Sequence, residues 1–425
     1  MLSDKVRFFS QILTFAVPYL FTLVRQRISA VIHKHKYKPL PKPQVKNVVV
    51  IGGSFAGVQI AKRFTETLPT GYRVVLVEKN SHLNYIFAFP RYSVVKGYEK
   101  YAFIPYTGIA KGAPPGIFEH VQDTATTLKK DHVLLSSGEK IEYAFLVLAT
   151  GTTSTMPSKV SSTSHIDAQA ELRNMQSKIS SAKRIAVVGG GAVGIEVASD
   201  IKDFCPEKDV TLIHSRAQLL PGFGKRLHDY AITRFQELGI SVLFNERPKI
   251  PGENGTLEFS NGKKEAFDLI IPCTGQKPNS DILASLSPES ISRQTSRILV
   301  ASTLQVSDPS LPNVFAFGDV AETGGPRMAR AAHFQGEIVL QNILAIIEGQ
   351  KPTKFYKPNI IFEGAIKLTL GKSKVVLYHQ EPNGREVLVV LNANSPDLGV
   401  KGQWRFYGVD VKKLQSIVEE AKGGS

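Results

Sequence analysis

The sequence predicts an α/β fold with two nucleotide-binding units, and two glycine clusters support this prediction. The first cluster lies between Gly52 and Gly57, the second between Gly189 and Gly194. Each follows a short apolar run rich in β-branched residues, as expected of a buried parallel strand, and each precedes a helical pattern. Strand, glycine turn and helix in this order are typical of a Rossmann-like βαβ unit.

The first cluster reads Gly-Gly-Ser-Phe-Ala-Gly. A dinucleotide pyrophosphate reaches the N–H groups of a helix N-terminus only where Cβ atoms do not block it, and Ser54 is small enough. The expected contacts are Gly52, Gly53, Ser54, Phe55, Ala56 and Gly57. The next strand, 72–77, ends before Glu78, whose carboxylate suits ribose hydroxyls; the alternative is a surface charge that ends the strand.

The second cluster predicts a second dinucleotide at Gly189, Gly191 and Gly194. The strand after it, 210–213, ends before His214, Ser215 and Arg216 instead of before an acid. Asp or Glu is typical of NAD sites, whereas Arg accommodates the 2′-phosphate of NADP. We expect Arg216 to permit NADPH; the alternative is a solvated arginine. Two dinucleotide sites in one chain predict FAD that is reduced by NAD(P)H.

Three further strand ends complete the two units. Ala149-Thr150-Gly151 follows a buried strand, and Cys273-Thr274-Gly275 repeats this pattern. A third strand, 313–317, leads into Gly318 and Asp319. We expect Asp319 to bond the ribityl hydroxyls of the flavin; the alternative is an Asp that only caps a helix. The NAD(P) unit is therefore expected to be inserted in the FAD unit.

The expected boundaries follow from these motifs. They are a membrane-anchor helix and basic linker (1–43), the first segment of the FAD domain (44–160), the NAD(P) domain (161–285), the second segment of the FAD domain (286–350) and a small α+β C-terminal region (351–425). In the last region we expect strands at 375–378, 387–391 and 404–407. A final helix should follow, with Val411, Leu414, Ile417, Val418 and Ala421 on one face.

The first tenth of the chain is basic. Residues 1–42 hold eight Lys or Arg against Asp4 alone, which is +7 of the net charge of +15. Residues 8–24 carry no charge, yet they are too few to cross the roughly 30 Å hydrocarbon core. Polar residues recur on one face, which favours a helix in the membrane interface, with contact through residues 5–31 and a kink or break at Pro18. A single span and a cleaved targeting peptide are the alternatives, and the linker 33–43 is expected not to fold.

Cysteine usage narrows the chemistry. Cys205 and Cys273 form no C-x-x-C pair, so we expect a reducing compartment and no dithiol chemistry. The sequence shows no clustered Cys/His spacing, so we predict no metal. Because the basic charge flanks an apolar segment, anionic lipid is a better expected partner than nucleic acid.

The order of these motifs resembles the two-dinucleotide-binding-domain flavoproteins, and most closely the apoptosis-inducing-factor-like, AMID-type oxidoreductases. That family includes the ferroptosis-suppressor NAD(P)H:quinone reductases. The stretches that support the resemblance are 210–215, 270–275, 313–319, 326–329 and 356–358, within a similarity that covers residues 45 to about 410. The resemblance implies transfer of hydride from NAD(P)H to FAD, and then of two electrons to a quinone or another small acceptor.

Further site residues follow from the resemblance. It implies that Arg91 and the backbone of Thr124 hold FAD, and we expect Thr150 and Gly151 to lie beside it. Gln335 precedes Gly336 in a pair similar to one near flavin and quinone in type II NADH dehydrogenases. Glu196 is expected to face the nicotinamide or the acceptor, with a helix-surface charge as the alternative. Glu196 and Gln335 are the candidate catalytic residues.

Two other functions fit some features of the sequence. One is a flavin reductase with a soluble acceptor such as ferredoxin, monodehydroascorbate or oxygen. The other is an apoptosis-inducing-factor-like nucleic-acid-binding or death-effector protein, which the concentration of charge in residues 1–42 disfavours. The apolar helix favours a quinone and a membrane-associated enzyme. The expected surface is a lipid droplet, a mitochondrion or another endomembrane, on the cytosolic side.

Overall fold

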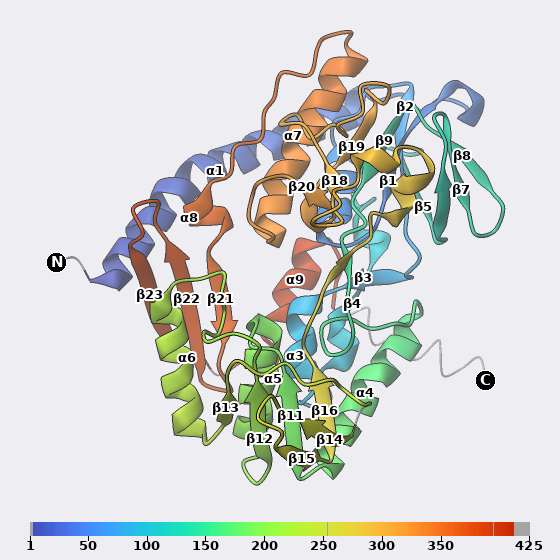
Figure 1. Cartoon of the computed structure of the whole chain (residues 1–425). Helices are drawn as coiled ribbons and strands as arrows, with labels where there is room; N and C mark the ends of the chain where they lie inside the picture. The colour runs from blue at the N-terminus through green and yellow to red at the C-terminus, as the bar shows by residue number, and fades with distance from the viewer. Residues whose placement is uncertain (1–2, 253, 394, 412–425) are drawn as a thin grey trace.

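Two parallel sheets organise the computed structural model, which describes residues 3–252, 254–393 and 395–411 (Figure 1). The larger sheet has the order β19-β9-β1-β2-β5 and the smaller the order β13-β12-β11-β16. The larger comprises β1 (Lys46–Ile51), β2 (Tyr72–Val77), β5 (Phe118–Val121), β9 (Phe145–Leu148) and β19 (Val314–Ala316). The smaller comprises β11 (Arg184–Val188), β12 (Asp209–Ile213), β13 (Ser241–Leu243) and β16 (Leu269–Pro272). Since β19 follows the whole smaller sheet in sequence, the predicted insertion of one unit in the other is confirmed.

Alternate residues of β1 enter two different cores, which explains its continuous apolar run. Val48 and Val50 pack toward one core, whereas Val49 and Ile51 face the other. Helices α2 (Phe55–Thr65) and α7 (Ala329–Ile347) cover the first face. The second face is covered by an antiparallel sheet of β6 (Ala125–Leu128), β7 (His132–Leu135) and β8 (Lys140–Glu142). In the smaller unit, α5 (Ala192–Phe204) and α6 (Lys225–Leu238) pack in one core with β11 and β12.

The C-terminal region is a small antiparallel sheet seated on the smaller unit. It contains β21 (Ile366–Thr369), β22 (Lys374–Gln380) and β23 (Glu386–Asn392), with α8 (Ile360–Glu363) before it. The strand expected at 404–407 is wrong, because this segment belongs to α9 (Val400–Phe406). Val400 and Trp404 are four residues apart, so a helix buries both on one face, and the Trp404 indole donates to Tyr101 O at 2.9 Å. The final helix expected around 411–421 falls almost wholly outside the described residues.

The first helix, α1 (Asp4–Lys36), is longer than expected and runs through Pro18 without a break (Figure 1). Contacts on both sides of Pro18 hold it against the protein. Arg7 pairs with Glu381 at 2.5 Å, and Tyr19 hydrogen-bonds His333 at 2.6 Å. These contacts offset a disturbance worth about 3 kcal/mol in an isolated helix.

The segment after α1 also folds, which corrects the expectation of an unstructured linker. His33, in the last turn of α1, contacts Leu68 O at 2.7 Å. Tyr37 is buried, and its hydroxyl donates to Tyr72 O at 3.0 Å. A 3-10 turn, Lys42–Gln44, then leads into β1. This segment is therefore ordered by tertiary contacts with β2 and with the loop after α2. The sequence pattern does not show these contacts.

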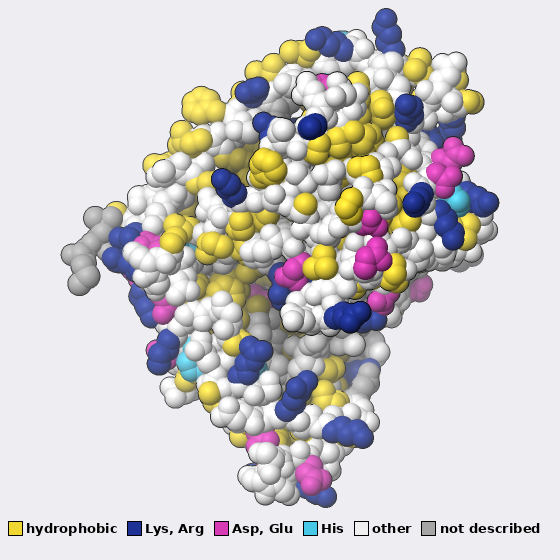
Figure 2. Space-filling view, turned by 45° about the horizontal axis from the view of Figure 1, so that its top comes forward, with side chains coloured by type: hydrophobic (Ala, Val, Ile, Leu, Met, Phe, Trp, Pro, Cys, Tyr) yellow, Lys and Arg dark blue, Asp and Glu magenta, His cyan; other side chains and the backbone are white. Residues whose placement is uncertain are grey.

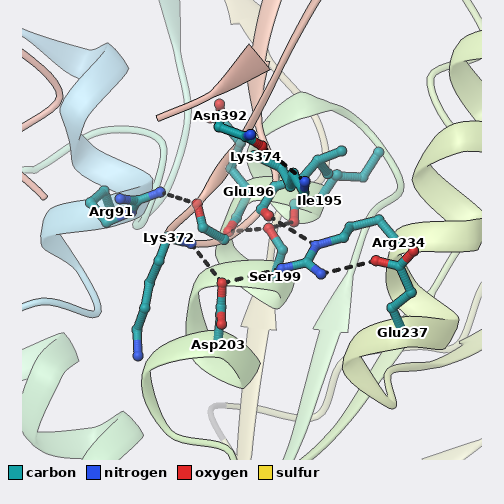
Figure 3. A network of polar contacts seen from close by, with 12 residues as sticks. Arg91, Ile195, Glu196, Ser199, Asp203, Arg234, Glu237, Lys372, Lys374 and Asn392 are labelled. Atoms are coloured by element: carbon teal, nitrogen blue, oxygen red, sulfur yellow. Dashed lines mark hydrogen bonds and ion pairs between the residues drawn. The ribbon is translucent and has the colours of Figure 1, made fainter. Parts of the chain in front are cut away.

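Carboxylates of α5 join three regions of the protein (Figure 3). Arg91, on α3 (Phe89–Tyr92) of the larger unit, donates to Asp200 Oδ2 at 2.6 Å and to Gly371 O at 2.8 Å in the β21–β22 turn. Arg91 and Asp200 have side chains 2% and 0% exposed. One turn further along α5, Asp203 accepts from Lys372 N at 2.7 Å. Through these bonds, Asp200 and Asp203 hold the larger unit and the C-terminal sheet against the smaller unit.

Replacing Arg91 by Met should destabilise the protein strongly, because it leaves the Asp200 carboxylate buried without its counter-ion. Breaking such a pair costs about 3–5 kcal/mol. Urea unfolding followed by circular dichroism measures the change. Arg173→Met is the matched control, since Arg173 is half-exposed and lies 3.9 Å from Glu99; its effect should stay below about 1 kcal/mol. Equal unfolding midpoints for the two variants would contradict this assignment.

Candidate functional site

The first glycine turn is shaped by close contact with the end of β9. Gly52 has a φ of +103°, and a Cβ there would lie 2.5 Å from Ala149 O. At Gly57 a Cβ would lie 1.7 Å from Gly52 O. Both positions therefore require glycine. Ser54, where the motif has its middle glycine, is the exposed N-cap of α2 and makes no side-chain capping bond among the described residues.

Glu78 lies against this turn, as the sequence predicts. Its carboxylate accepts from Gly53 N and, through Oε1, from Asn80 N at 2.9 Å. Tyr106 donates its hydroxyl to Gly53 O at 2.7 Å. A carboxylate at the end of the second strand and beside the glycine turn fits the hydroxyls of an adenosine ribose.

Asp319 lies in the 3-10 turn Gly318–Val320, which packs on the start of α2: a Cβ at Gly318 would lie 3.4 Å from Ala56 Cβ. Gln335 holds this turn, since its Oε1 accepts from Gly318 N at 2.8 Å. Burial raises the pKa of Asp319, whereas the positive charges of Lys159, Arg297 and Arg327 lower it. The turn therefore places a partly buried acid next to the first glycine turn.

The second glycine turn repeats the first. Gly189 has a φ of +130°, and a Cβ there would lie 2.5 Å from Cys273 O, at the end of β16. A Cβ at Gly194 would lie 1.9 Å from Gly189 O. His214 occupies the place of Glu78, and its Nδ1 accepts from Gly190 N at 3.1 Å. Arg216 is exposed two residues further on.

Gly191 tests whether this turn fits a dinucleotide. It is the N-cap of α5, and a Cβ added there would meet nothing within 4 Å among the described residues. The backbone at the helix N-terminus is thus approachable from this side, as a pyrophosphate requires. Both turns fit the groups that the sequence predicts, FAD at the first and NAD(P)H at the second.

Comparison with known proteins decides the family. The family model described as pyridine nucleotide-disulphide oxidoreductase matches residues 46–336. The chain belongs to this family. It is 32% identical to Fe-regulated protein 8 of Mycosarcoma maydis, over 88% of this chain and 98% of that protein. It is 31% identical to ferroptosis suppressor protein 1 of Homo sapiens, over 84% of this chain and 95% of that protein.

Solved structures agree on the fold. The sulfide:quinone oxidoreductase of Aquifex aeolicus superposes with a TM-score of 0.68 at 18% identity, over 85% of this chain and 90% of that one. The water-forming NADH oxidase of Lactobacillus brevis gives 0.62 at 20% identity, over 79% and 75%. With the family established, the protein is an oxidoreductase that uses FAD and NAD(P)H.

Two residues that the resemblance assigned to FAD have other partners. The guanidinium of Arg91 is buried against Asp200 and Gly371, as described above. The Thr124 amide donates to Asp123 Oδ1 at 2.6 Å, and its carbonyl accepts from Ser136 N at 2.8 Å. Both groups are therefore engaged within the protein, and contact with FAD at Arg91 and Thr124 stays a prediction. Of these partners, only Asp123 is adjacent in sequence to the residue that it contacts. The sequence motifs around Arg91 and Thr124 therefore did not reveal the other partners.

Thr150 and Gly151 lie where the chain crosses between the two units. Thr150 Oγ1 donates to Asn279 O, and Asn279 Nδ2 donates to Thr150 O, both at 2.8 Å. The crossing strands β10 (Thr152–Thr153) and β17 (Lys277–Pro278) pair directly beyond. These residues hold the crossover beside the first turn, and contact with FAD there stays a prediction.

Glu196 is not a free charge on the helix surface, because its carboxylate is hydrogen-bonded within the protein. Its Oε1 accepts from both the N–H and the hydroxyl of Thr369, each at 3.0 Å. Burial raises the pKa of Glu196 to about 7, with the charge of Asp200 adding to the effect. It can therefore exist in both protonation states near neutral pH. Its contact with the nicotinamide or the acceptor stays a prediction.

Sequence reasoning missed Tyr106 and Lys159. Tyr106 contacts the first turn from a segment without a recognisable motif. Lys159 donates to Thr152 O, and its charge acts on Asp319, while Asp319 and Glu78 act on Lys159 in turn. The charge of the lysine acts with both acids although the three residues are far apart in sequence. Spacing along the chain carries no signal for such a position.

Replacing Gly191 by Val should leave the FAD content intact, yet raise the KM for NADPH about tenfold or more, equivalent to about 1.4 kcal/mol of binding free energy. The reason is that valine, which is bulkier than the Ser54 that stands at the equivalent position of the first turn, fills the space that the pyrophosphate needs. Steady-state kinetics with ferricyanide as acceptor measure the KM. Gly222→Val is the matched control, because a Cβ at Gly222 also meets nothing within 4 Å among the described residues, outside both turns. An unchanged KM in Gly191→Val would refute this placement of NADPH.

Proposed function

We propose that this protein is a membrane-associated NAD(P)H:quinone oxidoreductase. The observation that carries the proposal is an exposed apolar stripe on α1, a helix bonded along its other face to the flavoprotein body. The resemblance to the ferroptosis-suppressor NAD(P)H:quinone reductases supports a quinone as acceptor, and relatives named ferroptosis suppressor protein 1 match most of the chain. An enzyme with a soluble acceptor has no need of such a stripe.

The stripe follows the helical period and is flanked by cations. It is visible along the upper-left margin of the molecule in Figure 2, where hydrophobic side chains lie over α1. Its most exposed member is Phe21, at 72%. The members are Val6, Phe9, Leu13, Val17, Leu20, Phe21, Val24, Ile28 and Val31. Apolar side chains with basic neighbours are typical of a helix that lies in the membrane interface.

The bonds between the inner face of α1 and the protein body argue against a membrane-spanning helix. Within the described residues of the chain, α1 is the single helix that could span a membrane by length and composition. Spanning would break its bonds to the body, among them Gln11 Nε2 to Glu381 at 2.6 Å and Gln26 Nε2 to Glu337 at 3.2 Å. Asp4 is also paired with Arg226 at 2.6 Å. A helix that keeps these contacts and buries its outer stripe in lipid satisfies both faces.

The residues would divide the work as follows. The turn Gly52–Gly57 with Glu78 and Asp319 would hold FAD, and the turn Gly189–Gly194 with Arg216 would hold NAD(P)H. FAD supplies the two-electron chemistry when bound. Reduction of a quinone to a quinol by NAD(P)H consumes one proton, and Glu196, with a pKa of about 7, can hold that proton near neutral pH.

Anaerobic stopped-flow mixing tests the function. NADPH or NADH should bleach the flavin band at about 450 nm, and a short-chain ubiquinone should restore it within the turnover time. Flavin that NAD(P)H does not reduce, or reduced flavin that only a soluble acceptor reoxidises, would overturn the quinone assignment. In Arg216→Ala the rate with NADPH should fall while the rate with NADH is kept, because the 2′-phosphate loses its cationic partner.

Membrane contact is tested by flotation with vesicles of phosphatidylcholine and phosphatidylserine. Leu20→Asp combined with Val24→Asp should lower vesicle binding at least hundredfold, since each buried aliphatic side chain contributes about 1.5–3 kcal/mol. Reduction of ferricyanide should be unchanged. Ile166→Asp is the matched control, because Ile166 is 53% exposed on α4 (His165–Ser181), away from α1. Equal binding by the two proteins would show that the stripe does not contact lipid.

A further inference from the structure

A cleft of about 370 Å³ lies between the inner side of α1 and the C-terminal region. Volumes of roughly 300–1,000 Å³ are typical of small-molecule sites. The apolar side of its wall consists of Phe8, Ile12, Phe15, Ile361, Phe362 and Ala365. Helix α1 supplies the first three of these, so the cleft exists only while α1 is docked.

Two polar side chains of the lining have buried atoms without a protein partner in the described residues, Gln11 Oε1 and His379 Nε2. The orientation of Gln11 is fixed, because its Nε2 donates to the Glu381 carboxylate at 2.6 Å and only the NH₂ end can donate. His379 is 2% exposed, and burial lowers its pKa, which keeps the ring neutral at pH 7. A neutral imidazole carries one donor and one acceptor nitrogen. Because buried polar atoms are generally paired, the two atoms point to a ligand with a polar ring edge.

The cleft is continuous with the proposed membrane face. Ile12 lines the cleft and is 36% exposed, and its neighbour Leu13 belongs to the outer stripe. An apolar chain attached to a ring in the cleft can therefore leave past Ile12 into lipid. This direction suits a molecule that is delivered by the membrane.

Contacts also lead from the cleft toward the Gly318–Asp319 turn. Phe15 is shared with a second cavity of about 310 Å³, which Tyr356 also lines. Tyr356 donates its hydroxyl to Glu363. Gln335, on α7, accepts from Gly318 N through Oε1 at 2.8 Å. At the start of α7, Arg330 lines the cleft three residues beyond Arg327, whose charge acts on Asp319. Helix α7 thus contributes Arg330 to the cleft and Gln335 to the turn that we assign to FAD.

We infer that this cleft admits the ring of a quinone with an apolar tail, taken up from the membrane that α1 contacts; this rests on the proposed function. His379, protonated at Nε2, donates to a carbonyl oxygen of the quinone, and Gln11 Oε1 accepts from a hydroxyl of the quinol. The same two atoms therefore serve both forms of the acceptor. The apolar walls accommodate the ring faces, and the tail follows α1 outward.

Two tryptophan substitutions one residue apart test the inference. Ile12→Trp fills the cleft and should raise the KM for decylubiquinone at least tenfold in phosphatidylcholine vesicles. Leu13→Trp adds the same volume on the outer face, where Leu13 is 63% exposed, and should leave that KM unchanged. His379→Phe should raise the KM for decylubiquinone and for the tail-less dimethoxy-methyl-benzoquinone alike. Flavin content, reduction by NADPH and turnover with ferricyanide should match the unmodified protein in all three.

The outcomes separate the inference from the function on which it rests. If the unmodified protein reduces decylubiquinone and Ile12→Trp keeps its KM, the cleft assignment fails while the quinone reductase stands. If the unmodified protein reduces neither quinone, both fail. Photolabelling with an azido-ubiquinone gives a readout independent of turnover. The label should reach peptides that contain Ile12, Phe362 or His379 and should be displaced by decylubiquinone; labelling confined to other segments would overturn the inference.

Discussion

The whole site depends on how closely each glycine turn approaches the end of the neighbouring strand. A side chain at Gly52 would lie 2.5 Å from Ala149 O, and one at Gly189 would lie 2.5 Å from Cys273 O. These contacts direct the first turn of α2 and of α5 at the carboxyl ends of the sheets, where open α/β sheets bind ligands. The same contact in both units makes them structural repeats. The two units share this backbone arrangement and differ in the side chains around it.

The differences between the units lie in few side chains. Glu78 and His214 accept from equivalent amides, Gly53 N and Gly190 N. A carboxylate at this place favours free ribose hydroxyls and repels an added phosphate, whereas a neutral imidazole followed by Arg216 does not repel it. The repeat therefore places side chains of different charge at the same position of two similar turns. On this basis we expect a preference of the second site for NADH or NADPH to depend on residues outside the glycine turn.

Sequence sufficed wherever the structure depends on neighbours along the chain. The glycine turns, the place of Glu78 beside Gly53 and the return of β19 to the first sheet follow from local patterns. It failed where partners are distant: Arg91 meets Asp200, 109 residues away, and α1 meets Glu381, so neither the buried pair nor the straight course through Pro18 could be predicted. The strand predicted at 404–407 was wrong for another reason. Its aromatic residues suit a strand, and burial of Trp404 beside Val400 favours a helix instead.

The docking of α1 determines what the membrane contact that we propose would do. A helix joined by an unfolded linker would bring the enzyme near lipid without orienting it. Here bonds at Arg7, Tyr19 and His33 hold α1 at three places along its length, at the end of β22, on α7 and in the loop after α2. The apolar stripe, the cleft beneath it and α7 therefore belong to one packed assembly. A membrane surface that accepts the stripe would then also set the direction from which a lipid-soluble molecule reaches the protein, because Ile12, which lines the cleft, is 36% exposed next to Leu13 of the stripe.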